Sequence, residues 1–272
     1  MKTTGVTAAA RRRGMVAVIA SVAGVGLSLG FTMPLIALLL ERDGHSATMI
    51  GLNSATSSLA MLVVAPLLPR LMGHLGTLPA LYLGIAVAAA ALLMMPLLPS
   101  LGAWFALRFV LGLGNAIHWV VSETWIITVA DSRNRGRVVG AYVTVLAAGL
   151  ACGPLLIGLT GIDGALPFVT GAGLIALAAV PLLFAGGGAP PVPAEAPAAL
   201  IAAARWAPAL MAVALLVGFT HIVVFALLPV YGVRLGLGQD TAVLMLSVFL
   251  AGSMVLQVPI GWLADRLGRE TM

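Results

Sequence analysis

Long apolar runs dominate the chain and are separated by short polar segments. Each run is long enough for a helix to cross the hydrocarbon core of a bilayer, which takes about 20 residues. The runs lack the apolar–polar alternation over about 10 residues that marks the strands of a membrane barrel. The pattern therefore predicts an all-α membrane protein with eight spans, at residues 14–40, 48–69, 78–98, 102–130, 137–160, 164–185, 207–233 and 240–262.

The composition agrees with this pattern. Apolar residues make up 61% of the 272-residue chain and charged residues 8%, whereas a soluble domain carries roughly 25% charged residues. So few charges cannot cover a water-facing surface, and we expect a lipid bilayer to be the solvent. The first run, 14–40, exceeds the roughly 7–15 apolar residues of a secretory signal, so we interpret it as a retained span.

Basic residues gather on one side of the predicted membrane. If the N-terminus is cytoplasmic, the outer side holds only Arg42 and Arg234. The inner side then holds eleven basic residues, namely Lys2, Arg11, Arg12, Arg13, Arg70, Arg133, Arg135, Arg137, Arg205, Arg266 and Arg269. Cytoplasmic loops carry an excess of Lys and Arg, so a cytoplasmic N-terminus is predicted. The basic clusters flank apolar runs and form no basic face with interleaved aromatics, which argues against nucleic acid as a partner.

Several kinds of chemistry are excluded by residue types that the sequence lacks. Cys152 is the single cysteine and Lys2 the single lysine, which removes disulfides, cysteine metal sites and the lysine of a phosphate loop. ATP-driven pumping by this chain is therefore not expected. No histidine pair has metal spacing, and the spans contain no Ser-His pair in a Gly-x-Ser-Gly context, no paired aspartates and no HExxH. We expect neither an enzyme nor a cofactor.

A Pro- and Gly-rich segment, residues 186–200, divides the predicted spans into six and two. We predict a six-helix unit at 1–185, a cytoplasmic linker at 186–206 and a partial second unit at 207–272. The two units echo one another, because Gly30-Phe-Thr-Met-Pro34 has a counterpart in Phe225-Ala-Leu-Leu-Pro229, and 69–77 has one in 261–269. A repeat of this kind is typical of transporters.

The segment Gly261-Trp-Leu-Ala-Asp265-Arg266-Leu-Gly268-Arg269 resembles the loop motif of the major facilitator superfamily. The glycines permit a tight cytoplasmic turn. Asp265 can face a helix N-terminus or an arginine, forming a latch that breaks as two half-bundles rock. The first copy departs from the motif, with Pro69, Gly73 and His74 at key positions, and we assign it no function.

Span five contains a second resemblance, to the glycine–proline motif of the superfamily's antiporters. Ile157 replaces one glycine of that motif, and its matching residues are Gly149, Gly153, Pro154 and Gly158. Small residues let membrane helices approach closely, and proline bends a span. Ordinary packing glycines are the alternative interpretation.

Span four holds the most informative polar residues. Arg108-Phe-Val-Leu-Gly112-Leu-Gly114-Asn115 resembles the superfamily's fourth-helix arginine motif, which is associated with proton coupling. Arg108, Asn115 and Ser122 are spaced by sevens and form one stripe that drifts only about 20° per heptad; Gly112, Trp119 and Glu123 lie beside it. A mid-helix arginine costs roughly 2.5–3.5 kcal/mol on insertion scales, so Arg108 is predicted to face the protein interior.

We expect Arg108 to be held either by polar groups of span two, which are Asn53, Ser54, Thr56 and Ser57, or by an anionic substrate group. Glu123 lies about 22 Å further along the helix and cannot pair with it. Glu123 is predicted either to be desolvated and carry a proton or to be a structural cap near Arg133 or Arg135. Thr32, His118 and His221 complete the candidate substrate and proton pathway, although a lone helix histidine more often packs through a hydrogen bond.

The stretch Glu123-Thr-Trp125, the run Asn134-Arg-Gly-Arg137 and Tyr142 are similar to the YcaD-like branch of bacterial carriers. The superfamily resemblance implies a monomer in the bacterial inner membrane that moves a small molecule by alternating access, coupled to protons. The antiporter-like span five favours efflux of a small amphipathic compound. The alternatives are a non-transporting sensor or scaffold and an inactive truncated carrier. The superfamily fold has twelve spans, so we expect these eight to lack part of the wall of the substrate site, whether the sequence is a fragment or a natural truncation.

Overall fold

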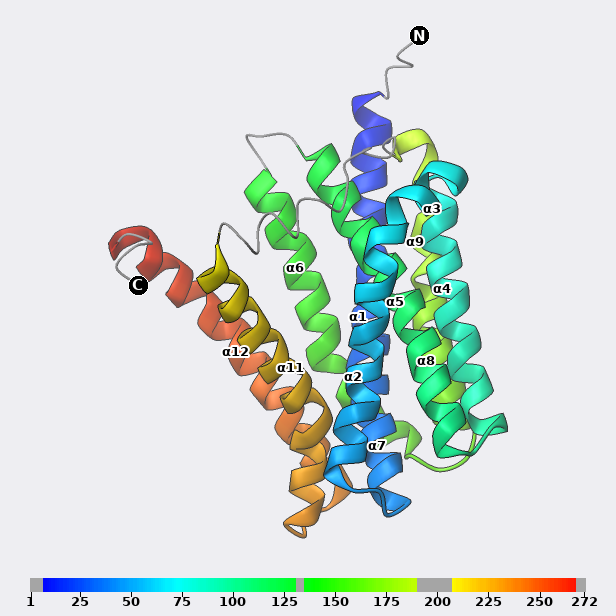
Figure 1. Cartoon of the computed structure of the whole chain (residues 1–272). Helices are drawn as coiled ribbons and strands as arrows, with labels where there is room; N and C mark the ends of the chain where they lie inside the picture. Colours follow the sequence, from blue (N-terminus) through cyan, green and yellow to red (C-terminus); the bar gives the residue numbers. More distant parts are fainter. Residues whose placement is uncertain (1–6, 131–134, 190–206, 268–272) are drawn as a thin grey trace.

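The computed structural model describes residues 7–130, 135–189 and 207–267, and every regular element within these ranges is a helix. Figure 1 labels the α-helices. In chain order the elements are α1 (Ala8–Arg42), α2 (Ala47–Val64), η1 (Ala65–Leu67), α3 (Leu68–Leu75), α4 (Thr77–Met94), η2 (Met95–Leu97), α5 (Leu101–Val129), α6 (Arg135–Cys152), η3 (Gly153–Leu156), α7 (Ile157–Thr160), α8 (Leu166–Leu177), α9 (Ala179–Leu182), η4 (Gly186–Gly188), α11 (Pro208–Arg234) and α12 (Gln239–Leu267). The predicted all-α membrane fold is confirmed.

The predicted spans correspond to these helices within a few residues, with two differences in length. Six helices or helix pairs are long and apolar enough to cross a membrane. The apolar stretch Leu166–Leu182 is shorter than that, and α12 continues past the predicted end of its span at 262 to Leu267. Large apolar side chains such as Leu62, Leu159 and Phe184 are exposed on the surface, which is the surface that a helical bundle presents to lipid.

Polar residues in the turns fix where helices begin and end. Ser46 and Ser100 are N-caps, and their hydroxyl oxygens accept hydrogen bonds from the backbone N–H groups of Met49 and Ala103. Arg11 closes the other end of α5, because its Nε donates to the Val129 carbonyl at 2.7 Å and its Nη2 bonds the same oxygen. A cation at a helix C-terminus also favours the helix dipole.

Helix α1 runs through the centre of the bundle (Figure 1) and crosses α6 at very close range. A Cβ atom added to Gly149 would lie 2.8 Å from the Leu27 nitrogen, and one added to Gly153 would lie 2.6 Å from the Leu27 oxygen. Gly30 makes the matching approach to the backbone of Leu150. Only glycine permits backbones to meet at this distance.

Helix α5 packs between α2 and α4 through two glycines on different faces. A Cβ atom on Gly112 would lie 2.5 Å from the Ser57 oxygen of α2, and one on Gly114 would lie 2.6 Å from the Gly84 oxygen of α4. These two crossings fix the rotation of α5 about its own axis, and therefore determine which of its side chains point inward.

Helices α11 and α12 contact the rest of the bundle mainly at one end. We call this the Arg42 end, where α1 finishes, and the opposite one the Ala8 end. The buried residues of α11 and α12 lie toward the Arg42 end and include Phe225, Val230, Val243 and Leu246, whereas α11 is largely exposed from Pro208 to His221. Figure 1 shows the far end of α12 pointing away from the other helices.

Most of the predicted loop motif lies within a helix. Helix α12 continues to Leu267, so the backbone from Gly261 to Arg266 is helical. The predicted end of the span at 262 is therefore five residues short, and the cytoplasmic turn stays a prediction. Gly268, Arg269 and residues 190–206 of the predicted linker lie outside the described residues.

Candidate functional site

Buried polar side chains line one face of α5. Arg108 is 1% exposed, His118 and Ser122 are fully buried, and Asn115 is half-buried. Trp119 is also half-buried on this helix. The arginine faces protein and not lipid, as the insertion cost of its charge requires.

Arg108 lies level with Asn53 of α2. Both helices begin at the Arg42 end and run in the same direction, and Gly112 packs against Ser57. One turn back along both helices places Arg108 and Asn53 at the same level, and we infer that the two side chains are neighbours. Asn53 is completely buried, and neither of its amide atoms has a hydrogen-bond partner within the described part of the chain; the same holds for the Arg108 Nε.

The expectation that polar groups of span two hold Arg108 through hydrogen bonds is therefore not met at Asn53. Thr56 is engaged elsewhere, because its hydroxyl donates to the Leu52 carbonyl of its own helix at 2.9 Å. A buried polar group without a partner costs on the order of 1–3 kcal/mol. The Arg108–Asn53 pair thus combines a positive charge with unused hydrogen-bonding capacity in the middle of the packed helices.

His118 joins α5 to α1. Its Nε2 lies 2.9 Å from the Ser21 hydroxyl, and its Nδ1 has no partner in the described ranges. Both side chains are fully buried. This is the hydrogen-bonded packing arrangement that is common for a lone helix histidine.

Ser122 joins α5 to α6. Its hydroxyl donates to the Trp119 carbonyl at 2.9 Å and shares a second hydrogen bond, also 2.9 Å, with the Tyr142 hydroxyl. Glu123 follows directly and lies close enough to act electrostatically on that hydroxyl. The sequence did not single out Tyr142 for this position, since its partner becomes evident only once α6 is packed against α5.

The Glu123 side chain is exposed on the surface of the bundle, and its role as a proton carrier stays a prediction. Glu123 makes no ion pair with Arg135, while Arg133 lies outside the described residues. This carboxylate follows the buried Tyr142–Ser122 pair and acts on the Tyr142 hydroxyl electrostatically.

Thr32 and His221 do not join the α5 face. The Thr32 hydroxyl donates to the Ser28 carbonyl at 2.7 Å, and its methyl group packs where a Cβ on Gly171 of α8 would lie. His221 is exposed on the part of α11 toward the Ala8 end. Sequence reasoning grouped these residues by polarity alone, whereas helix rotation separates them.

The glycine–proline motif of span five bends the helix and packs it. Gly153–Leu156, which contains Pro154, forms a 3₁₀ turn, and the α-helix resumes at Ile157. Gly149 and Gly153 face α1, and the Asp240 side chain of α12 lies 3.5 Å from the Cβ position of Gly158. The motif therefore packs span five against α1.

A second polar cluster, which sequence reasoning missed, lies at the Arg42 end. Arg234 of α11 binds Glu41 of α1 through two hydrogen bonds of 2.8 and 2.7 Å. Arg42 binds Asp163 at 2.7 Å and Asp43 at 3.3 Å. The sequence held one signal for this cluster: Arg42 and Arg234, the two arginines predicted on the outer side, each follow a span and have acids nearby in the sequence.

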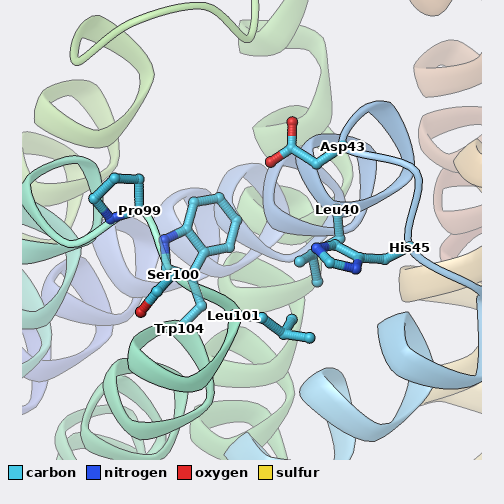
Figure 2. A pocket seen from close by; sticks show the side chains of 7 residues that line it. All are labelled: Leu40, Asp43, His45, Pro99, Ser100, Leu101 and Trp104. Atoms are coloured by element: carbon cyan, nitrogen blue, oxygen red, sulfur yellow. The ribbon is translucent and has the colours of Figure 1, made fainter.

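Two cavities lie away from Arg108 and Asn53. A pocket of 60 Å³ at the Arg42 end, seen in Figure 2, is lined by Leu40, Asp43, His45, Pro99, Ser100, Leu101 and Trp104. It is far smaller than the roughly 300–1,000 Å³ of ligand pockets. An open apolar groove of 450 Å³ runs over α11 and α12, lined by Leu228, Thr241, Leu244, Met245, Val248 and Phe249. Neither is lined by Arg108 or Asn53.

Comparison with known proteins identifies the family. The model of the Major Facilitator Superfamily matches residues 18–272. The "Uncharacterized MFS-type transporter YfkF" of Bacillus subtilis (strain 168) is 27% identical over 253 residues, which is 91% of this chain and 65% of that protein. The "Uncharacterized MFS-type transporter YcaD" of Escherichia fergusonii is 29% identical over 247 residues, 89% of this chain and 64% of that protein.

The YcaD protein of Escherichia coli O139:H28 is 28% identical over the same length. The chain spans less than two thirds of the length of these curated relatives. The matched family model covers nearly all of the helices described above, including α5 with its buried arginine and the α1–α6 crossing. The chain therefore belongs to the major facilitator superfamily of membrane transporters.

Proposed function

We propose that this protein is a monomeric secondary transporter that exports a small amphipathic molecule from the bacterial cytoplasm in exchange for protons. Residues 1–185 and 207–272 form two units, joined by a cytoplasmic linker at 186–206, that rock about a central site. The N-terminus is cytoplasmic, so the Ala8 end faces the cytoplasm and the Arg42 end faces outward. Alternating access of this kind is how repeat-built carriers move substrate.

The observation that carries this proposal is the uneven packing of α11 and α12. Their buried residues, such as Val230 and Val243, lie toward the Arg42 end, where the Glu41–Arg234 ion pair also joins the two units. The helices separate toward the Ala8 end (Figure 1). In the proposed orientation this corresponds to a carrier closed to the outside and open to the cytoplasm.

The two ends of the α5 polar face take different roles in the proposed cycle. Arg108 and Asn53 contact the substrate, while Glu123 exchanges protons with cytoplasmic water beside the Tyr142–Ser122 hydrogen bond. His118, Asn115 and Trp119 lie between them along the helix. A membrane potential supplies about 2.3 kcal/mol per charge for each 100 mV, which is enough for one proton to drive uphill movement of a substrate.

Proton-coupled flux in reconstituted vesicles tests the proposal. Vesicles containing the protein and an internal pH indicator are given a panel of amphipathic compounds, and compound-dependent proton movement is recorded for the wild type and for Glu123→Gln. We expect at least one compound to move protons in the wild type, with the response lost in Glu123→Gln. Equal responses would refute Glu123 as the coupling group, and no protein-dependent flux with any compound would favour a sensor or scaffold.

A further inference from the structure

Arg108 has no counter-ion among the described residues. A guanidinium keeps its charge at physiological pH, and this one is 1% exposed with an unpartnered Nε. Removing an ion from water is expensive unless an opposite charge or several hydrogen bonds replace the hydration. The arrangement is therefore incomplete as an electrostatic unit.

The acids that the structure describes are committed elsewhere. Glu41 binds Arg234, while Asp43 and Asp163 bind Arg42. The remaining acids whose side chains are described are Asp240, which lies against Gly158 of α7, and Glu123, which is about 22 Å along α5 from Arg108. The charge that balances Arg108 must come from outside this set.

The group beside Arg108 has both donor and acceptor capacity. Asn53 is fully buried, and its Nδ2 and Oδ1 are both unpartnered. This holds for either orientation of the amide, so the ambiguity of amide flips does not matter. A ligand that fits must accept from the guanidinium and from Nδ2, and must donate to Oδ1.

We propose that Arg108 and Asn53 form a binding site for the carboxylate of a 2-hydroxy acid, which deepens and rests on the transport function proposed above. The planar guanidinium matches a carboxylate with two parallel hydrogen bonds. The Asn53 Nδ2 donates to the same carboxylate, and the neighbouring ligand hydroxyl donates to Oδ1. Asn115, two turns along the same face, also has a buried Oδ1 without a partner in the described ranges, so unused hydrogen-bonding capacity continues along the helix from Arg108.

Direct binding of radiolabelled mandelate to the protein in lipid nanodiscs tests this site. Mandelate combines an apolar ring with a carboxylate and an adjacent hydroxyl; phenylacetate lacks the hydroxyl, mandelamide lacks the charge and benzylamine reverses it. We expect saturable mandelate binding, with phenylacetate weaker by about fivefold, corresponding to one neutral hydrogen bond. Mandelamide and benzylamine should not compete.

Variants assign the binding to the two residues. Arg108→Gln should weaken mandelate binding by about thirtyfold or more, because it removes a buried charged partner. Arg108→Lys keeps the charge but cannot make two parallel hydrogen bonds to the carboxylate, so its affinity for mandelate should fall about tenfold. Asn53→Leu should reduce the preference for mandelate over phenylacetate, and Arg12→Gln, which removes an exposed arginine near the N-terminus, should change nothing.

The thermal unfolding of Arg108→Gln without ligand separates binding from folding. Its midpoint should equal or exceed that of the wild type, since an unpaired buried charge is gone. Absence of saturable mandelate binding, equal binding to Arg108→Gln, or competition by benzylamine would overturn the carboxylate site. If one of these binding results is obtained but the protein still moves a neutral or cationic compound across vesicles, the carboxylate site is refuted and the transport function is not.

Discussion

Arg234 at the end of α11 holds the Glu41 carboxylate at the end of α1 with two hydrogen bonds, 2.8 and 2.7 Å long. The next residue of α1, Arg42, turns instead to Asp163 in the loop before α8. Two adjacent residues thus serve two different boundaries. Glu41 joins the α1–α9 part of the chain to α11. Arg42 makes its contacts within the α1–α9 part, to Asp163 and Asp43.

Removing the Arg234 charge is expected to loosen the Arg42 end. With Cys152→Ser as background, spin labels at His45→Cys and Leu237→Cys report the distance between the turns that follow α1 and α11. The wild type should show one main distance. Arg234→Gln should add a longer one, because the contact between the two parts loses its charged hydrogen bonds, and high salt should act in the same direction.

The matched control is Arg42→Gln, which breaks only contacts within the α1–α9 part and should leave the distance unchanged. Exchanging the charges in Glu41→Arg/Arg234→Glu should restore the wild-type distribution. If Arg42→Gln and Arg234→Gln act alike, the ion pair has no specific role between the two parts.

The α2–α5 crossing should be intolerant of a single methyl group. Gly112→Ala places a Cβ 2.5 Å from the Ser57 oxygen, and the backbone must shift. We expect a loss of about 1–3 kcal/mol in unfolding free energy, measured by denaturant titration in micelles. Gly102→Ala, on the same helix with open space around it, should be neutral; equal losses in both variants would contradict the proposed crossing.

The α1–α6 crossing should also be intolerant of an added methyl group, whereas a control glycine on the same helix should accept one. Gly149→Ala brings a Cβ within 2.8 Å of the Leu27 nitrogen and should lower the melting temperature. Gly140→Ala on the same helix meets nothing and should be neutral or stabilising by up to about 1 kcal/mol, since alanine is the better helix former. Thermal melting of both variants in one detergent decides the matter, and a stabilised Gly149→Ala would show that the helices are not in backbone contact.

The Ser21–His118 hydrogen bond predicts a non-additive pair of substitutions. Ser21→Ala leaves the buried His118 ring with a second unpartnered nitrogen and should cost about 1–3 kcal/mol of stability. Ser21→Ala/His118→Leu removes both polar groups and should be more stable than Ser21→Ala alone. Unfolding free energies of the singles and the double test this, and strict additivity would argue against the contact.

Helix positions and the inward orientation of Arg108 could be predicted because each depends on one local quantity. Apolar run length sets a span, and the cost of a charge in lipid turns Arg108 inward. Partners could not be predicted in the same way. That His118 meets Ser21, or that Arg108 lies beside Asn53 without bonding it, depends on how far each helix is rotated and shifted, which glycine contacts such as Gly112 against Ser57 determine.

Ion pairs between helices far apart in the chain could not be predicted from the sequence for a related reason. Glu41 and Arg234 are 193 residues apart, and no periodicity links two helix ends across a linker. The exposure of Glu123 could not be predicted either, because which face of α5 stays uncovered depends on where the neighbouring helices lie.

Water access to the α5 face tests the central claim most directly. In a Cys152→Ser background, Asn115→Cys is exposed to a membrane-impermeant, negatively charged thiol reagent and separately to a maleimide confined to lipid; Leu177→Cys, on the exposed face of α8, is the control. The account predicts that Asn115→Cys reacts with the water-borne reagent from the Ala8 side, while Leu177→Cys reacts only with the lipid-confined maleimide. Labelling of Asn115→Cys exclusively from lipid would contradict a water-filled carrier cavity beside Arg108.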